Sequence, residues 1–301
     1  MIDINELTEI CNRLNCKVIA EADLSDYTTF KIGGACRALI DVCSAESTAE
    51  LLRYTVKNNI KYAVIGRGSN IIASDNGFDG IILHFGSAFS DISVNDTSIT
   101  AQAGAMLSAV CRKAQESGLS GMENLFGIPG TVGGALYMNA GAYGSEMKDI
   151  AVSAEYIDEN GDINTISSDD MDLSYRHSIF AEKDCIITSV TMNLKKGNPD
   201  SIKSAMNECM QKRASKQPLE YASAGSTFKR PKGSYASLLI EQCGLKGLSV
   251  GGAEVSTKHS GFVINKGGAT CADVLELCEK VRTVVNEKTG YILELEPVIL
   301  K

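Results

Sequence analysis

The chain has 301 residues, which is enough for about two domains and a sizeable core, so its stability requires neither disulfides nor a structural metal. Acidic residues outnumber basic ones by 37 to 29, and the net charge of −8 argues against nucleic acid or an anionic membrane as the main partner. No apolar run reaches the roughly 18 residues of a membrane span. The first ten residues, MIDINELTEI, are acidic and unlike a secretory signal, so we expect a cytoplasmic protein.

The ten cysteines need an explanation of their own. They include no C-x-x-C pair, and only His84, His177 and His259 are present as further ligands, so we expect no metal site. Cys271 and Cys278 lie one heptad apart, on one stripe of a helix. We therefore interpret the cysteines as reduced, buried thiols.

The first periodic region begins with a strand at Ala38–Cys43, a helix at Ser44–Asn59 and a second strand at Lys61–Ile65. A dinucleotide-binding Rossmann unit would open a helix after the next glycine loop. Here Ile71–Ala73 and the turn Asp75–Gly77 follow, which is β-type sequence, so the loop joins two strands instead. Its glycines and polar residues form either a tight turn or an anion-binding nest. The loop consists of Gly66, Arg67, Gly68, Ser69 and Asn70.

A second glycine segment, Gly127–Gly144, follows a helix that we predict at Ala105–Ser117, ending before Gly118. It is too apolar and too specific to be a flexible linker. It is either a cluster of packed turns or a place where a flat or phosphorylated ligand reaches the main chain. The small residues concerned are Gly130, Gly133, Gly134, Ala135, Ala140 and Gly141.

The remaining elements mix helices and strands without strict alternation, which indicates an α+β fold. We predict a hairpin at Val152–Ile166 around Asn160-Gly161, strands at Cys185–Leu194, Ala253–Ser256, Phe262–Asn265 and Tyr291–Leu300, and helices from Asn198-Pro199 to about Ala214, at Ser234–Cys243 and at Thr270–Lys288. Gly197–Pro199 is the predicted domain boundary.

Three places hold polar residues that could carry chemistry. Arg176 follows an acidic run and is either a surface salt-bridge partner or a bidentate ligand for a carboxylate or phosphate. Ser226 lies in a basic segment, 212–232, which is either a solvated loop or an anion site. Glu294 and Glu296 share one face of the predicted last strand and either face solvent or act in acid–base or electrostatic roles.

The ordered set of motifs resembles the UDP-N-acetylenolpyruvoylglucosamine reductase family over residues 27–298. TTFKIGG at 28–34, GRGSN at 66–70 and the segment 127–144 are similar to the family's flavin-binding half. YRHSIF at 175–180, AGSTFKRP at 224–231 and the LELE end at 293–296 are similar to its three catalytic segments. Any one motif is modest support; the ordered set is specific.

The resemblance implies a cytoplasmic flavoenzyme of peptidoglycan precursor synthesis. NADPH would reduce bound FAD, and the flavin would reduce UDP-N-acetylglucosamine-enolpyruvate to UDP-N-acetylmuramate. The implied fold has an FAD-binding domain of the vanillyl-alcohol-oxidase type with two subdomains, at 33–90 and 91–198. An N-terminal segment at 1–32 precedes it, and an α+β substrate-binding domain at 199–301 follows.

The resemblance also implies roles for single residues. Arg176 matches the arginine that stabilises the enolate-like carboxylate, and Ser226 matches the serine that protonates the carbanion. Glu296 matches the third catalytic residue; Pro297 replaces the family's valine here, so Glu294 stays open as the inward carboxylate. The expected FAD-binding residues are Gly66, Arg67, Gly68, Ser69, Asn70, Gly130, Gly133, Gly134, Ala135, Asn139 and Gly141. The expected UDP-sugar contacts are Lys216, Lys229 and Arg230, with Lys258 and His259 as further candidates.

The interval between Arg176 and Ser226 is too short for the substrate-clamping tyrosine insertion of one subgroup, so the chain resembles the shorter subgroup. Two alternatives remain open from the sequence. One is another flavin-dependent oxidoreductase on the same scaffold, although no histidine that could tether a flavin lies in either glycine loop. The other is a non-catalytic nucleotide-binding protein, which would be expected to lack the set Arg176, Ser226 and Glu296.

Overall fold

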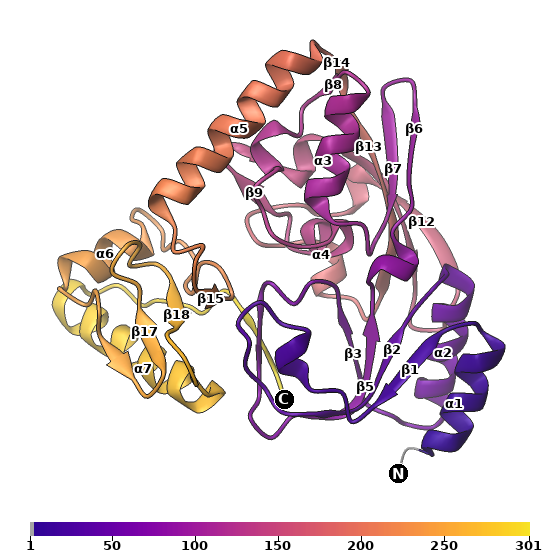
Figure 1. The fold of residues 1–301 in the computed structure, drawn as a ribbon, viewed down its shortest axis with the longest axis horizontal. Helices are drawn as coiled ribbons and strands as arrows, with labels where there is room; N and C mark the ends of the chain where they lie inside the picture. Colours follow the sequence, from indigo (N-terminus) through magenta and orange to yellow (C-terminus); the bar gives the residue numbers. More distant parts are fainter. Residues whose placement is uncertain (1–2) are drawn as a thin grey trace. The chain divides into compact units, whose positions relative to one another are not determined.

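The computed structural model describes residues 3–301, which form two compact units with separate hydrophobic cores (Figure 1). Unit 1 comprises the chain up to Ala20, Ala38–Arg67 and Gly80–Lys212. Unit 2 comprises Glu21–Arg37, Gly68–Asp79 and Arg213–Lys301. Among the described residues, no helix is both long enough and apolar enough to cross a membrane.

Within residues 3–301 the two units contain seven α-helices. They are α1 (Ile4–Arg13), α2 (Ala45–Lys57), α3 (Leu107–Glu116), α4 (Val132–Tyr137), α5 (Pro199–Lys216), α6 (Ala236–Gln242) and α7 (Cys271–Thr289). Ser44 caps α2 and Thr270 caps α7 in reciprocal capping boxes, and α7 ends at Gly290 with φ +75°. The helices predicted at Ser44–Asn59, at Ala105–Ser117, from Asn198-Pro199 and at Thr270–Lys288 are confirmed.

Unit 1 contains a four-stranded and a five-stranded sheet. The first has the order β1-β2-β5-β3, with α1 and α2 beside it, and the second has the order β12-β11-β13-β7-β6, with α4 packed against β7 and β13 (Figure 1). The strands are β1 (Lys17–Ala20), β2 (Cys36–Asp41), β3 (Tyr62–Ile65), β5 (Phe78–His84), β6 (Ile92–Asn95), β7 (Ser98–Gln102), β11 (Ala151–Ile157), β12 (Ile163–Ser167) and β13 (Ile186–Asn193). Two short pairs join β8 (Leu119–Ser120) to β14 (Lys195–Lys196) and β9 (Gly141–Ala142) to β10 (Ser145–Glu146).

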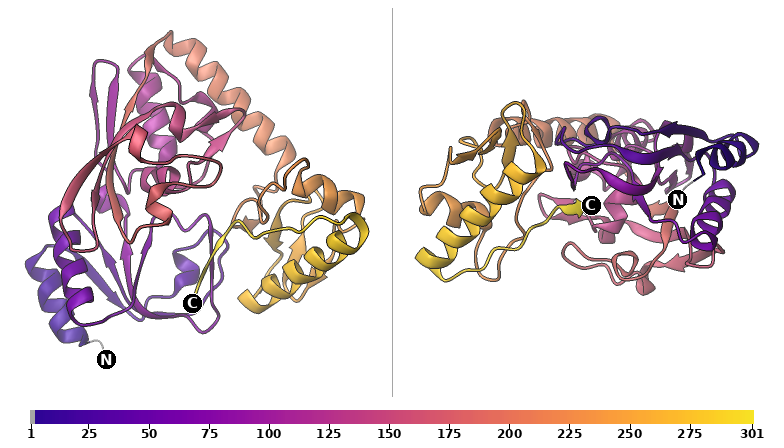
Figure 2. Two further views of the ribbon diagram at one scale, coloured as in Figure 1. Left: turned by 180° about the vertical axis from the view of Figure 1, so that it is seen from behind. Right: turned by 90° about the horizontal axis from the view of Figure 1, so that it is seen from below.

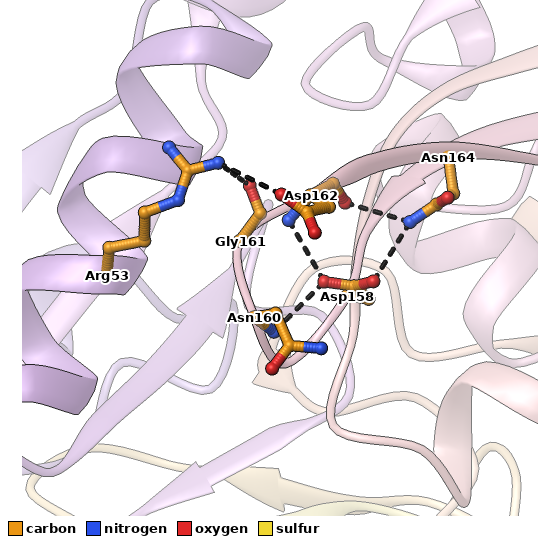
Figure 3. Close-up of polar contacts among 6 residues, drawn as sticks. All are labelled: Arg53, Asp158, Asn160, Gly161, Asp162 and Asn164. Carbon is orange, nitrogen blue, oxygen red and sulfur yellow. Dashed lines mark hydrogen bonds and ion pairs between the residues drawn. The ribbon is translucent and has the colours of Figure 1, made fainter.

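The predicted hairpin at 152–166 is confirmed as β11–β12, and its tip lies against α2 (Figure 3). Arg53 of α2 donates to the Gly161 carbonyl at 2.5 Å, and its guanidinium lies 3.4 Å from the Asp162 carboxylate. The Asp158 carboxylate accepts from two backbone N–H groups of the turn and from the Asn164 amide. The bonds to Asp158 fix the turn, and those from Arg53 connect it to α2.

Unit 2 is built on a four-stranded antiparallel sheet with the order β15-β18-β17-β16, against which α6 and α7 pack (Figure 2). Its strands are β15 (Ala222–Ser223), β16 (Ser249–Val250), β17 (Ala253–Val255) and β18 (Val263–Asn265). A separate parallel pair joins β4 (Ile71–Ala73) to β19 (Val298–Leu300). Phe30 and Ile72 belong to this core, which connects the early segments to the C-terminal region.

The unit division differs from the domain ranges expected from the sequence. The segments 21–37 and 68–79 join the C-terminal unit because β4 pairs with β19 and because Thr29 exchanges hydrogen bonds with Ser223. The division falls inside α5, after Lys212, rather than at Gly197–Pro199. The turn at Asn198 does cap α5, but the helix continues across the boundary between the units.

Two details of the secondary structure were not predicted. No helix was predicted within the segment 127–144, yet Val132–Tyr137 forms α4. The strand predicted at Tyr291–Leu300 forms only at its end, as β19; before it, a single bridge pairs Leu295 with Phe228. The other predicted strands and helices are present, with ends that differ by a few residues.

Candidate active site

In unit 1, Arg176 lies at the tip of a tight two-residue turn. Ser174 and His177 exchange two backbone hydrogen bonds of 3.2 Å each, which leaves Tyr175 and Arg176 as the tip. Arg176 has φ +55°, a left-handed conformation that is uncommon for a side-chain-bearing residue. Its guanidinium carbon lies 5.2 Å from the centre of the Tyr175 ring, and Tyr175 is exposed.

The two glycine segments meet in unit 1 at Thr131, the N-cap of α4. The Thr131 hydroxyl accepts from the N–H of Gly134 at 3.5 Å. A Cβ added at Gly66 would lie 2.3 Å from that hydroxyl oxygen, and a Cβ at Gly133 would lie 2.8 Å from the Cβ of Ala103. Both positions therefore require glycine because of packing within the protein.

Gly134 differs, because only the Thr131 hydroxyl at 3.7 Å would contact an added Cβ. Gly134 is exposed, and Tyr137 follows three residues later, also exposed, on the same face of α4. A flat ring system can lie against bare main chain at such a face. The exposed main chain at Gly134 therefore leaves room for a flavin nucleotide, whereas packing within the protein explains the glycine at position 133.

Two of the expected FAD-binding residues turn their side chains inward. Ala135 is 5% exposed and Asn139 is fully buried, so a contact from either to a cofactor would involve the main chain. Gly141 is constrained as well, because an added Cβ would lie 2.6 Å from the Ser145 carbonyl oxygen. Arg67, the last residue of the Ala38–Arg67 segment of unit 1, is exposed.

Unit 2 brings together the second half of the first glycine loop and the C-terminal acidic segment. Gly68 has φ +64°, and an added Cβ would lie 2.2 Å from the Tyr27 carbonyl oxygen. The Asn70 amide donates to the Glu296 carbonyl at 3.3 Å, and the Asn70 carbonyl accepts from Val298 at 2.9 Å. Ser69 between them is half-buried.

Ser226 lies next to a strongly anchored pair of residues in the same unit. Thr227, 3% exposed, accepts the Val263 N–H on its hydroxyl at 2.8 Å, and its carbonyl accepts the Glu296 N–H at 3.0 Å. Phe228 is buried in the core of unit 2. Within the described residues, the half-buried Ser226 hydroxyl makes no hydrogen bond to protein. The structure thus places the Ser226 and Glu296 segments side by side.

The two C-terminal glutamates have different surroundings. The Glu294 carboxylate is 72% exposed and lies 3.6 Å from the Lys229 ammonium group. Glu296 is half-buried, and its main chain is held on both sides, by Thr227 and by Asn70. The Glu294 side chain is therefore largely exposed at the surface, whereas Glu296 is half-buried on a fixed stretch of main chain.

The expected substrate contacts are spread over the surface of unit 2. Lys216 is exposed at the end of α5, and the guanidinium of Arg230 lies 4.6 Å from the centre of the Tyr235 ring. His259 packs edge-on against Phe262 at 5.0 Å and accepts the Gly261 N–H on Nδ1. Burial lowers the pKa of His259, so it is held as a neutral, packed side chain.

The cysteines form no disulfide: all ten are present as free thiols. Burial raises the pKa of Cys11, Cys111 and Cys278 to about 12, which keeps these thiols protonated and unreactive. Across residues 3–301 no group of three or more His, Cys, Asp or Glu side chains is placed to hold a metal ion.

Sequence reasoning did not single out Thr131, Thr227 or Ser178, although each fixes a site segment. Ser178 is fully buried and donates to the Tyr137 carbonyl at 2.7 Å. The signal for Thr131 was present, because a threonine directly before a helical segment is a common N-cap. Nothing local in the sequence marks the partners of Thr227 and Ser178, which lie 36 and 41 residues away.

Comparisons with known proteins show which family this chain resembles. Residues 217–300 match the family model of the UDP-N-acetylenolpyruvoylglucosamine reductase C-terminal domain, and residues 36–167 match an FAD-binding domain model. The chain is 46% identical to the UDP-N-acetylenolpyruvoylglucosamine reductase of Caldanaerobacter subterraneus over 94% of this chain and 93% of the relative. It is 42% identical to the same-named protein of Clostridioides difficile over 98% and 96% of the two chains.

A crystal structure of UDP-N-acetylenolpyruvylglucosamine reductase from Thermus caldophilus superimposes with a TM-score of 0.79 at 32% identity, covering 95% of this chain and 99% of that one. The predicted α+β fold, with an FAD-binding domain of the vanillyl-alcohol-oxidase type, is confirmed. The expectation of an FAD-dependent enzyme, rather than a non-catalytic nucleotide-binding protein, is confirmed too. The chain belongs to the UDP-N-acetylenolpyruvoylglucosamine reductase family, the FAD-dependent oxidoreductases of peptidoglycan precursor synthesis.

Proposed function

We propose that this chain reduces the enolpyruvyl group of UDP-N-acetylglucosamine-enolpyruvate with Arg176, Ser226 and Glu296 as its catalytic residues. When bound, FAD would supply the hydride for the terminal enol carbon, with NADPH as the source of that hydride. The neighbouring carbon, next to the substrate carboxylate, then holds an electron pair and must receive a proton. The observation that carries the proposal is the direct bonding of the Ser226 and Glu296 segments through Thr227.

Arg176 binds the substrate carboxylate in this proposal. A guanidinium stays charged at every physiological pH and offers paired N–H donors that match a carboxylate. Negative charge grows on the carboxylate as the hydride arrives, and a fixed cation stabilises that charge more in the transition state than in the ground state. The tight turn that holds Arg176 provides the fixed placement that this role requires.

Ser226 donates the proton to the carbon next to the carboxylate. A serine hydroxyl is a poor acid, so its alkoxide must be stabilised or its proton supplied again. Glu296 is the proposed acid or electrostatic partner in this step. It is half-buried and lies near Ser226 in the fold, because the residue before it, Leu295, forms a β-bridge with Phe228, two residues beyond Ser226. The C–H bond formed at this carbon and the hydride added at the terminal carbon complete the lactyl ether.

The remaining residues hold the two ligands in this proposal. The open main chain at Gly134, the half-buried Gly130 and the exposed Arg67 would lie against FAD. Lys216, Lys229 and Arg230 would hold the diphosphate of the UDP-sugar. The Lys229–Glu294 ion pair is exposed, and exposed pairs are weak, so Lys229 can exchange Glu294 for a phosphate at little cost.

The cytoplasm is the proposed location, since the reductant NADPH and ten free thiols both belong to a reducing compartment. The net charge of −8 supports a small-molecule partner rather than nucleic acid or an anionic membrane surface.

The two half-reactions of the Ser226→Ala variant test the assignment. Flavin reduction by NADPH should stay within about twofold of wild type, because no substrate proton is involved. Flavin reoxidation by the enolpyruvyl substrate should slow by about 100-fold or more, in the range of a lost general acid. Thr257→Ala, an exposed hydroxyl in the same unit, is the control and should leave both rates unchanged. Equal slowing of both half-reactions by Ser226→Ala would contradict the assigned role.

A further inference from the structure

The side chain of Asn139 connects the segment after α4 to the turn that carries Arg176. Its Nδ2 donates to the Ser174 carbonyl at 2.9 Å and to Glu146 Oε2 at 3.0 Å, and its Oδ1 accepts the Lys148 N–H at 2.9 Å. Asn139 is fully buried. Both amide protons and the oxygen are thus engaged within unit 1, and the amide is not directed toward a cofactor.

A second bond holds the other side of the same turn. Ser178 is fully buried, and its hydroxyl donates to the Tyr137 carbonyl at 2.7 Å. Ser174 and Ser178 flank Arg176, so both sides of its turn are attached to the three residues 137–139. Tyr137 is the last residue of α4, on the face proposed for the flavin, and the other two residues follow the helix directly.

The turn needs such support because its backbone is strained. Arg176 adopts φ +55°, and Asn139 itself adopts φ +40°. Left-handed conformations at residues other than glycine persist only when the surrounding structure holds them in place. The Asn139 amide bond also orients Glu146, whose pKa is held below its ordinary value by the Lys148 ammonium group, by Asn139 and, more weakly, by Arg176. The carboxylate of Glu146 therefore stays charged in the electrostatic field of Arg176.

We propose that Asn139 and Ser178 are positioning residues, which hold Arg176 at a fixed place relative to the residues after α4, so that its guanidinium meets the substrate carboxylate. The inference rests on the proposed role of Arg176. Small displacements of a charge-stabilising group weaken transition-state stabilisation steeply, whereas hydride transfer from NADPH to the flavin does not use the substrate carboxylate. The effect of losing either residue should therefore appear in one half-reaction only.

The test uses holoenzyme of Asn139→Gly and Ser178→Ala in rapid-mixing measurements of both half-reactions, normalised to bound flavin. Glycine adopts positive φ freely, so Asn139→Gly removes the amide without adding backbone strain. Thr55→Val in α2 is the matched control: it removes a buried hydroxyl that also donates to a carbonyl at 2.7 Å, in the same unit but away from this turn. Ser178→Ala keeps the test informative if Asn139→Gly folds poorly.

We expect Asn139→Gly to slow flavin reoxidation by UDP-N-acetylglucosamine-enolpyruvate by about tenfold or more, and Ser178→Ala by about threefold or more. Flavin reduction by NADPH should change by less than about twofold in both variants and in Thr55→Val. If both half-reactions slow equally in the two turn variants, the residues are merely structural and the proposal is overturned.

A double-substitution cycle separates this inference from the role of Arg176. In an Arg176→Gln background, Asn139→Gly should slow reoxidation by less than about twofold further, because there is no guanidinium left to position. A full tenfold effect in that background would overturn the inference while leaving Arg176 catalytic. If Arg176→Gln alone leaves reoxidation at the wild-type rate, the proposed role of Arg176 fails, whatever the outcome for Asn139.

Discussion

Thr227→Val should destabilise unit 2 through a single lost acceptor. The Thr227 hydroxyl, 3% exposed, accepts the N–H of Val263, which is 2% exposed, at 2.8 Å. Valine keeps the shape of threonine but cannot accept, so the Val263 N–H would be buried without a partner. Such a group costs about 1–3 kcal/mol, which is the expected loss in the free energy of unfolding.

A matched substitution separates this cause from the general effect of removing a hydroxyl. Thr55→Val in α2 also removes a fully buried hydroxyl, but that group donates to the Leu52 carbonyl, which lies inside a helix and keeps its backbone partner. Its cost should stay below about 1 kcal/mol.

Denaturant unfolding followed by far-ultraviolet circular dichroism measures both losses, and hydrogen exchange reports the Val263 amide directly. We expect that amide to exchange faster in Thr227→Val and at the wild-type rate in Thr55→Val. If Thr227→Val costs no more than Thr55→Val and leaves exchange at Val263 unchanged, the reasoning is refuted.

Three further predictions concern the turn at Gly161, the pH dependence of stability and the two C-terminal glutamates. Gly161→Ala should lower the free energy of unfolding by about 1–3 kcal/mol in denaturant titrations, because φ is +82° and the new Cβ would lie 2.7 Å from the Arg53 side chain of α2. The control Gly144→Ala, with φ +87° and nothing within 4 Å of the new Cβ, should lower it by about 1 kcal/mol or less. Equal losses in the two variants would contradict the packing argument. Burial lowers the pKa of His259 below its unfolded value near 6.5, so protonation favours the unfolded chain and stability should fall as the pH drops below about 6.5. His259→Asn should flatten this dependence, and an NMR titration that finds the pKa at or above 6.5 would exclude the explanation. Glu296→Gln should slow flavin reoxidation by about 100-fold while Glu294→Gln changes it by less than about threefold; the reverse order would identify Glu294 as the acting carboxylate.

The sequence predicted the elements whose signals are local. The strand Ile71–Ala73 after the first glycine loop was recognised from its own β-type residues, and this excluded a Rossmann unit. The helix predicted at Thr270–Lys288 is confirmed as α7, with Thr270 as its N-cap and Gly290 as its C-cap. A capping residue or a glycine in a turn acts on its nearest neighbours, so its signal is contained in a few adjacent residues.

Elements and contacts that depend on distant residues were missed. α4 has six residues, two of them glycine, and such a helix has no stability of its own. It forms because Thr131 caps it and because it packs against β7 and β13. Alternation at 291–297 predicted a strand, but no partner strand pairs along that stretch in the described structure, apart from the bridge at Leu295.

The unit division could not be predicted for the same reason. It depends on the parallel pairing of β4 with β19, which are more than 200 residues apart, and on the Asp75 carboxylate that accepts the first N–H groups of α7. For the candidate site, the roles of the residues named from the sequence stay predictions, and the engagement of Asn139 within unit 1 became visible only in the structure. Side-chain burial cannot be inferred from a motif alone.

The most direct test of the account is a rapid-mixing experiment on the wild-type protein purified with its FAD. The flavin is first reduced with one equivalent of NADPH, and UDP-N-acetylglucosamine-enolpyruvate is then added without oxygen. The account predicts that the oxidised flavin spectrum returns and that one UDP-N-acetylmuramate forms per flavin. Flavin that stays reduced after the substrate is added, in protein that binds FAD and is reduced by NADPH, would contradict it.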